Sequence, residues 1–151
     1  MTTARRRRFW GWGWEDAGPS PEHIAAIAQV LASRFGVEAP TAVPPPRLDE
    51  IALRPARVAP PTALAPRCST APYDRAGHTY GKSFRDIVRA MRRDFGTAPD
   101  LVAFPRHEAD ITALLDWAAQ ARVAVIPYGG GSSVVGGVEA RIDDRYRGSL
   151  S

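Results

Sequence analysis

The chain has 151 residues, a formal net charge of +4 and a single cysteine. This length fits one domain, and a lone cysteine excludes both an internal disulfide framework and a multi-cysteine metal site. No apolar run approaches the roughly 20 residues that span a bilayer, and no signal-peptide core follows the N-terminal arginines. These features predict a cytoplasmic protein without a transmembrane segment.

Four arginines, residues 5–8, precede the aromatic sequence FWGWG at residues 9–13. Cations beside aromatic rings are typical of nucleic-acid-binding arms and of interfacial anchors. Glycines at 11 and 13 interrupt any amphipathic helix, and two acidic residues follow at 15 and 16. We predict that this segment packs on the domain and binds no nucleic acid, with an arginine-rich nucleic-acid binder as the alternative.

A first helix is predicted to begin after Ser20, with Pro21 at its first position, and to end at Gly36. Its apolar residues recur at three- and four-residue steps, which is the pattern of a short amphipathic helix. Residues 40–66 hold eight of the 14 prolines. They predict a mostly extended connector with at most one helical turn around residues 48–53.

A second helix is predicted after Ser83, whose hydroxyl and the Asp86 carboxylate form a capping pair. Its apolar face is expected to run to Phe95, before Gly96, and its arginines 85, 89, 92 and 93 to form a solvated face. The preceding sequence AGHTYGKSFRD places His78 near Tyr80 and Lys82, a pattern that acid–base catalysis can use. We predict instead a packing loop, and no catalytic residue or metal ligand anywhere in the chain.

Residues 101–105 and the apolar sequence VAVI at 123–126 are predicted strands, joined by a helix at residues 108–121. The inward helix residues are expected to be Ile111, Leu114, Leu115 and Ala118. Such a βαβ unit makes its two strands parallel, so the predicted class is α/β (α+β overall). Residues 143–151 are predicted to be a polar tail.

The sequence PYGGGSSVVGG follows the second strand at residues 127–137. It lacks the Lys and hydroxyl residue of a Walker A loop, and Val134 fills the third glycine position of the Rossmann fingerprint. A glycine loop between extended segments can still bind a diphosphate through its backbone amides. A hairpin without a ligand is the alternative.

With the flanking sequences DLVAFPRHEADITALLDWAAQARVAVI, HTYGKSFRD and FWGWG, this loop resembles the PCMH-type FAD-binding domain of the vanillyl-alcohol-oxidase superfamily. Within it, the chain is similar to the alkylglycerone-phosphate synthases, also called alkyldihydroxyacetonephosphate synthases, and to their bacterial FAD-dependent relatives. The resemblance implies FAD as the cofactor and a loop that contacts its pyrophosphate. The implied contact residues are Pro127, Tyr128, Gly129, Gly130, Gly131, Ser132, Ser133 and Val134.

Relatives that attach the flavin covalently through this loop carry a histidine where this chain has Gly131, so the resemblance implies noncovalent binding. It also implies a helical and proline-rich region at 1–98, followed at 99–151 by the first part of the FAD domain, truncated. The full-length enzyme is then expected to act on a small-molecule or lipid-type substrate and to form a homodimer. An inactive remnant or a non-catalytic binding module is the alternative.

Overall fold

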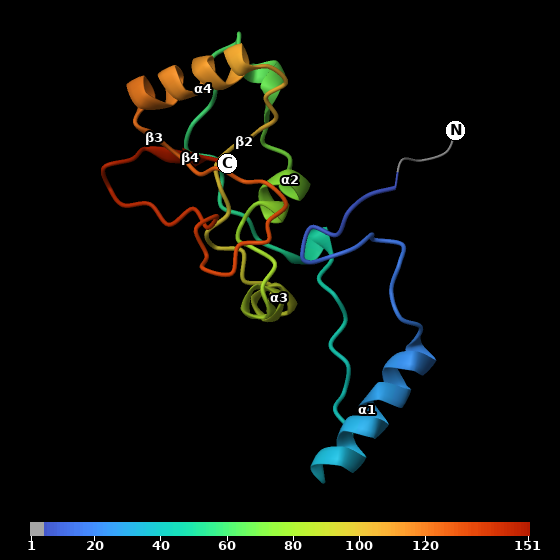
Figure 1. Cartoon of the computed structure of the whole chain (residues 1–151). Helices are drawn as coiled ribbons and strands as arrows, with labels where there is room; N and C mark the ends of the chain where they lie inside the picture. The colour runs from blue at the N-terminus through green and yellow to red at the C-terminus, as the bar shows by residue number, and fades with distance from the viewer. Residues whose placement is uncertain (1–4) are drawn as a thin grey trace.

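The computed structural model describes residues 5–151, and Figure 1 shows their course. The chain contains both helices and very short strands, so the predicted mixed α/β class is confirmed. The element order is α1 (Pro21–Phe35), η1 (Leu48–Glu50), η2 (Ala65–Arg67), β1 (Cys68–Ser69), α2 (Pro72–Gly77), α3 (Phe84–Met91), β2 (Val102–Ala103), α4 (Glu108–Ala121), β3 (Val123–Val125) and β4 (Gly148–Leu150).

Helix α1 begins and ends where the capping residues predict. The Ser20 hydroxyl accepts a hydrogen bond from the amide of His23 at 3.2 Å, and Gly36 takes the left-handed conformation that ends the helix. The helix points away from the rest of the chain in Figure 1, and none of its residues is buried. Its apolar side chains therefore lie on the surface, including Phe35, which is 66% exposed.

The proline-rich connector is extended, as predicted, with the single turn η1 inside the expected range. A second turn, η2, was not predicted. The connector is fixed to the rest of the chain by Arg54 and Arg57, whose side chains both bind the fully buried carboxylate of Asp100. A proline-rich segment without regular backbone pairing is thus held in place by charged hydrogen bonds.

The strands form two small sheets, and residues 101–103 pair with strands of both. Strands β1 and β2 are antiparallel, whereas β3 and β4 are parallel, with Val123 opposite Gly148. A parallel bridge also joins Leu101 to Leu150. Strand β4 therefore lies between the chain at Leu101 and β3.

The βαβ prediction is correct in strand direction, because the chain at Leu101 and β3 both run parallel to β4. The two are not neighbours, however, and residues 148–150 are a fully buried strand where a polar tail was predicted. Small side chains are required there: a Cβ on Gly148 would lie 2.7 Å from a methyl carbon of Val58. Because this strand depends on small side chains and backbone pairing, its sequence shows no apolar pattern.

Helix α4 covers this sheet with a narrower apolar stripe than predicted. Leu114 and Ala118 are buried against Leu101, Val123 and Leu150. Ile111 and Leu115 remain about half exposed, so the prediction that they point inward is wrong. The strands beneath α4 are only two or three residues long and cover only one row of its side chains.

Helix α3 starts with the predicted capping pair of Ser83 and Asp86. It ends at Met91, because Arg93 has a left-handed backbone, and Phe95 is buried beyond the helix. The solvated arginine face is correct for Arg85 and Arg92 but wrong for Arg89, whose side chain is only 15% exposed and binds Glu139.

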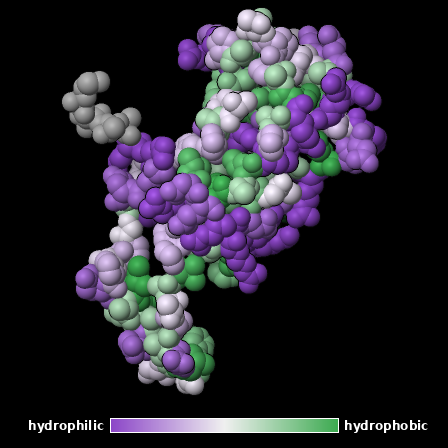
Figure 2. Space-filling model, turned by 180° about the vertical axis from the view of Figure 1, so that it is seen from behind, coloured by the Kyte–Doolittle hydropathy of each residue, from purple (hydrophilic) through white to green (hydrophobic). Residues whose placement is uncertain are grey.

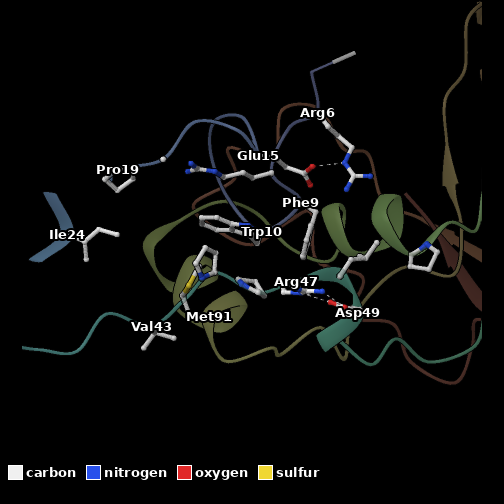
Figure 3. A pocket seen from close by; sticks show the side chains of 16 residues that line it. Arg6, Phe9, Trp10, Glu15, Pro19, Ile24, Val43, Arg47, Asp49 and Met91 are labelled. Carbon is white, nitrogen blue, oxygen red and sulfur yellow. Dashed lines mark hydrogen bonds and ion pairs between the residues drawn. The ribbon is translucent and has the colours of Figure 1, made fainter. Parts of the chain in front are cut away.

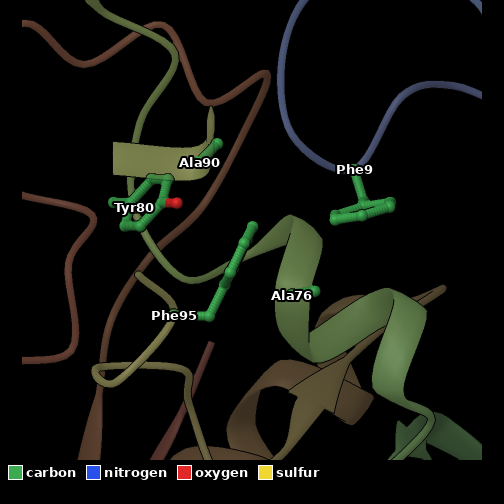
Figure 4. Packing of buried hydrophobic residues seen from close by; sticks show 5 residues of the cluster. All are labelled: Phe9, Ala76, Tyr80, Ala90 and Phe95. Carbon is green, nitrogen blue, oxygen red and sulfur yellow. The ribbon is translucent and has the colours of Figure 1, made fainter. Parts of the chain in front are cut away.

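A second hydrophobic cluster joins the N-terminal segment to α2 and α3 (Figure 4). It consists of Phe9, Ala76, Tyr80, Ala90 and Phe95. The ring centroid of Phe9 lies 5.8 Å from that of Phe95. The prediction that FWGWG packs on the domain is confirmed for Phe9.

The arginines of the N-terminal cluster contact residues 14–16, which lie close to them in the sequence. Arg5 and Arg6 form exposed ion pairs with Asp16 and Glu15, each at 2.8 Å, and the guanidinium of Arg7 lies 3.9 Å from the centre of the Trp14 ring. These contacts favour a packing role for the segment. Within residues 5–151, no helix has the length and apolar character needed to cross a bilayer.

Candidate functional site: the glycine loop after β3

The glycine loop leaves the carboxyl end of β3, the end at which parallel α/β sheets usually bind ligands. Gly129 and Gly130 are exposed, and a Cβ added at either position would meet no atom within 4 Å. A side chain at either position would therefore extend into open space. Val134 and Val135 are 84% and 95% exposed, so this loop does not bury its own apolar residues.

Gly131 has a different environment from the two glycines before it. It is buried, its φ is +74°, and a Cβ there would lie 2.9 Å from Cζ of the Tyr128 ring. A side chain is excluded both by the left-handed backbone and by the tyrosine. Gly131 thus shapes the loop, whereas Gly129 and Gly130 leave it open.

Tyr128 anchors the start of the loop. Its hydroxyl donates a hydrogen bond to the carbonyl of Gly77 at 2.8 Å, and its ring stacks on His78 with centroids 4.0 Å apart. Burial, followed by the nearby charge of Asp86, raises the pKa of Tyr128 to about 12. The phenol therefore remains a neutral hydrogen-bond donor at physiological pH.

Glu139 anchors the other end of the loop. It accepts a hydrogen bond from Thr97 at 2.8 Å and forms ion pairs with Arg89 at 2.9 Å and Arg141 at 3.0 Å. Burial alone would raise the pKa of Glu139, but these donors lower it overall. The loop is thus held at both ends, with its open glycines between them.

The sequence HTYGKS packs directly against the loop, as predicted for this segment. A Cβ on Gly81 would lie 2.6 Å from the carbonyl oxygen of Ser133 and 3.3 Å from that of Gly131. Only glycine fits between these two backbone oxygens without displacing them. The structure therefore brings residues 77–82 and the predicted phosphate loop into one site.

Lys82 is part of this site and was missed by the sequence analysis. Its ammonium donates a hydrogen bond to the carbonyl of Gly130 at 3.3 Å. The indole nitrogen of Trp12 donates to the carbonyl of Lys82 at 2.9 Å, and the ammonium lies 5.3 Å from the Trp12 ring centre. The sequence offers one signal for Lys82, because it is the only lysine among 20 basic residues.

His78 links the site to Ser151, the residue that follows β4, and makes stability depend on pH. Its Nδ1 lies 2.9 Å from the hydroxyl of Ser151. Burial lowers the pKa of His78 to about 4, a shift that the charge of Asp74 opposes and that of Lys82 reinforces. The folded chain therefore holds a neutral imidazole and binds fewer protons than the unfolded chain between about pH 6.5 and pH 4.

We expect His78 to lower the free energy of unfolding by about 2 kcal/mol when the pH falls from about 7.5 to about 5. This contribution to stability is complete above the pKa of His78 in the unfolded chain. It is lost as the pH drops toward the pKa of His78 in the folded chain. Urea unfolding of the wild type and of His78→Phe at both pH values measures the difference. An equal loss in the two proteins would contradict the assignment.

A cavity of about 960 Å³ lies elsewhere, between the N-terminal segment, α1 and the proline-rich connector (Figure 3). Its walls include Trp10 and Met91 and contain no residue of the glycine loop. Two of its arginines, Arg6 and Arg47, are ion-paired with Glu15 and Asp49. The glycine loop, with its open main chain, is the better candidate for an anion site.

Part of this chain is similar in sequence to known proteins. Residues 99–144 match a family model described as an FAD binding domain. The alkyldihydroxyacetonephosphate synthase of Dictyostelium discoideum is 37% identical over 76 residues, which are 50% of this chain and 12% of that protein. The enzyme of the same name from Trypanosoma brucei brucei is 39% identical over 67 residues, 44% of this chain and 11% of that protein.

The fold is also similar to that of a solved structure. A solved structure titled alkyldihydroxyacetonephosphate synthase superposes with a TM-score of 0.74 and 21% identity, over 97% of this chain and 32% of that one. This chain thus matches only a small part of the length of its relatives. Residues 99–144 thus resemble an FAD-binding domain in sequence, in a chain that is similar to alkyldihydroxyacetonephosphate synthase in sequence over half of its length and in fold over nearly all of it.

Proposed function

We propose that residues 127–134 hold the pyrophosphate of FAD through their main-chain amides. The observation that carries this proposal is the open backbone of Gly129 and Gly130, placed after a parallel strand in a loop that is anchored at both ends. Successive amides without side chains form a concave donor surface that suits a diphosphate. The hydroxyl groups of Ser132 and Ser133 can donate further hydrogen bonds.

The cofactor in this proposal is bound without a covalent bond. Gly131 offers no nucleophile, and the nearest histidine described in the loop's surroundings, His78, is stacked on Tyr128 and bonded to Ser151. Cys68 lies in β1, in the other sheet, and burial raises the pKa of its thiol. None of these side chains is presented to a flavin as a reactive group.

We further propose that the chain serves a flavin-dependent reaction of the alkylglycerone-phosphate synthase type, in which an acyl chain of a glycerone phosphate lipid is exchanged for a fatty alcohol. FAD supplies the reactive flavin ring. Residues 99–151 would bind its pyrophosphate, and residues 77–82, from the N-terminal region 1–98, would form one wall of that site. The substrate class, a lipid, rests on the names of the relatives alone.

A titration of the purified chain with FAD tests the binding proposal. We expect saturable binding, with a flavin absorption band near about 450 nm that remains after gel filtration. Acid precipitation of the complex should release all of the flavin into the supernatant, because no covalent bond forms. Flavin retained in the pellet would contradict the noncovalent assignment, and no binding at any concentration would contradict the proposed function.

A further inference from the structure

Lys82 occupies an unusual electrostatic position beside the glycine loop. Its side chain is partly buried between the Trp12 ring and the carbonyl of Gly130. Among the described residues, no carboxylate lies within ion-pair distance of it. The nearby carboxylate of Asp86 instead accepts hydrogen bonds from the amide and hydroxyl of Ser83, at 3.1 and 2.8 Å.

The surroundings of Lys82 disfavour its charge. Burial and, to a lesser degree, the positive charge of Arg7 lower the pKa of Lys82. A partly buried cation without a counter-charge loses hydration, and here one carbonyl and one aromatic ring replace only part of it. An anion placed at the open face of the glycine loop would supply that counter-charge.

The donors of Lys82 point to the same anion. An ammonium group carries three N–H donors, and one of them is used by the Gly130 carbonyl. This contact fixes the ammonium next to the two glycines whose main chain is open. Lysine is a common phosphate ligand in nucleotide sites, where it acts as a compact point charge.

We propose that Lys82 is a ligand of the FAD diphosphate and supplies the positive charge that the glycine loop itself lacks. The inference rests on the proposed function, because it places the diphosphate on residues 127–134. Trp12 is a positioning residue in this arrangement: its indole nitrogen holds the backbone of Lys82, and its ring lies beside the ammonium. The N-terminal FWGWGW segment would thereby contribute indirectly to cofactor binding.

Three substitutions separate the charge of Lys82 from its hydrogen bond. Lys82→Arg keeps both, Lys82→Gln keeps a donor for the Gly130 carbonyl without the charge, and Lys82→Met removes both. Arg34→Met on α1 is the matched control, because it removes one positive charge from an exposed helix that points away from the loop. The dissociation constant of FAD is measured for each variant at low and high salt, together with the urea midpoint without FAD.

We expect FAD binding to weaken about 10- to 100-fold in both Lys82→Gln and Lys82→Met, with little change in Lys82→Arg and Arg34→Met. The two neutral variants should also lose part of the salt dependence of binding, since salt screens the ammonium–phosphate attraction. Urea midpoints within error of the wild type would show that the loss concerns the ligand.

Other results would overturn the inference in distinct ways. Wild-type affinity in Lys82→Gln would show that only the hydrogen bond to Gly130 matters, and unchanged affinity in Lys82→Met would exclude any contact with the ligand. In both cases FAD binding by the wild type would still support the proposed function. A wild-type chain that binds no FAD would contradict the proposed function itself.

Discussion

Replacement of Asp100 by alanine is expected to lower the free energy of unfolding by about 3 kcal/mol. Asp100 is completely buried and accepts hydrogen bonds from the side chains of Arg54 and Arg57 and from the amides of Arg57 and Ser149, the last at 2.7 Å. Alanine would leave two guanidinium groups and two amides without their acceptor. The estimate is at the low end of the range for buried pairs, because the arginine side chains are 29% and 43% exposed.

Asp100 also joins three parts of the fold, namely the proline-rich connector, the start of β2 and strand β4. Burial by itself would raise the pKa of Asp100, but the arginine and amide donors lower it far below its ordinary value. The ionised form thus stabilises the fold at neutral pH, and this contribution is lost as the pH falls below about 4.

Urea unfolding at neutral pH measures the effect of Asp100→Ala, and Asp49→Ala is the matched control. Asp49 also pairs with an arginine, Arg47, but both side chains are at least 65% exposed, so a loss below about 0.5 kcal/mol is expected. If Asp100→Ala does not fold, Asp100→Asn keeps the shape and two of the acceptor positions and should fold with reduced stability. Equal stability of Asp100→Ala and Asp49→Ala would contradict the role of Asp100 in joining the proline-rich connector, the start of β2 and strand β4.

Replacement of Gly130 by valine is expected to abolish FAD binding without lowering stability. A Cβ at Gly130 meets no protein atom within 4 Å, so the folded chain has room for the side chain. The same side chain would stand where the diphosphate must approach the loop amides. Urea unfolding and an FAD titration of the same protein sample measure the two effects separately.

Gly137→Val is the control for this substitution. Gly137 is also exposed, with no atom within 4 Å of an added Cβ, but it lies outside the proposed contact residues. The Gly137→Val variant should bind FAD like the wild type. Gly131→Val should lose both stability and binding, because its positive φ and the Tyr128 ring exclude a side chain. Normal FAD binding by Gly130→Val would show that the diphosphate does not lie on this part of the loop.

The apolar residues of helix α1 are exposed on the surface of the molecule. The space-filling view in Figure 2 shows hydrophobic residues along the narrow projection formed by α1, where they meet solvent. Ile27, Leu31 and Phe35 are 47%, 39% and 66% exposed. This helix follows from its capping residues and its apolar periodicity, but none of its residues is buried.

The sequence was most informative where local chemistry decides the structure. Ser20 and Gly36 mark the ends of α1, and the Ser83–Asp86 pair marks the start of α3, because each side chain or backbone conformation satisfies free groups of its own helix. The glycine loop was located because three adjacent glycines after an apolar strand have few other structural uses. These signals act within a few residues of the chain.

The errors concern contacts between distant residues. Strand β4 was missed because Gly148 and Ser149 are selected for close approach to Val58 and Asp100, and their small size resembles that of loop residues. Arg89 was placed in solvent because helix periodicity does not reveal Glu139, which lies 50 positions later in the chain. Lys82 was missed for the same reason, since only the fold brings it to Gly130, 48 positions away.

The most direct test of the account is an amide NMR titration of the isotope-labelled chain with FAD. If the main chain of the glycine loop binds the pyrophosphate, the largest shift changes will fall on the amides of residues 129–133 and saturate with a single binding constant. Changes confined to residues around the Trp10 and Met91 cavity, with the loop amides unmoved, would contradict the central claim.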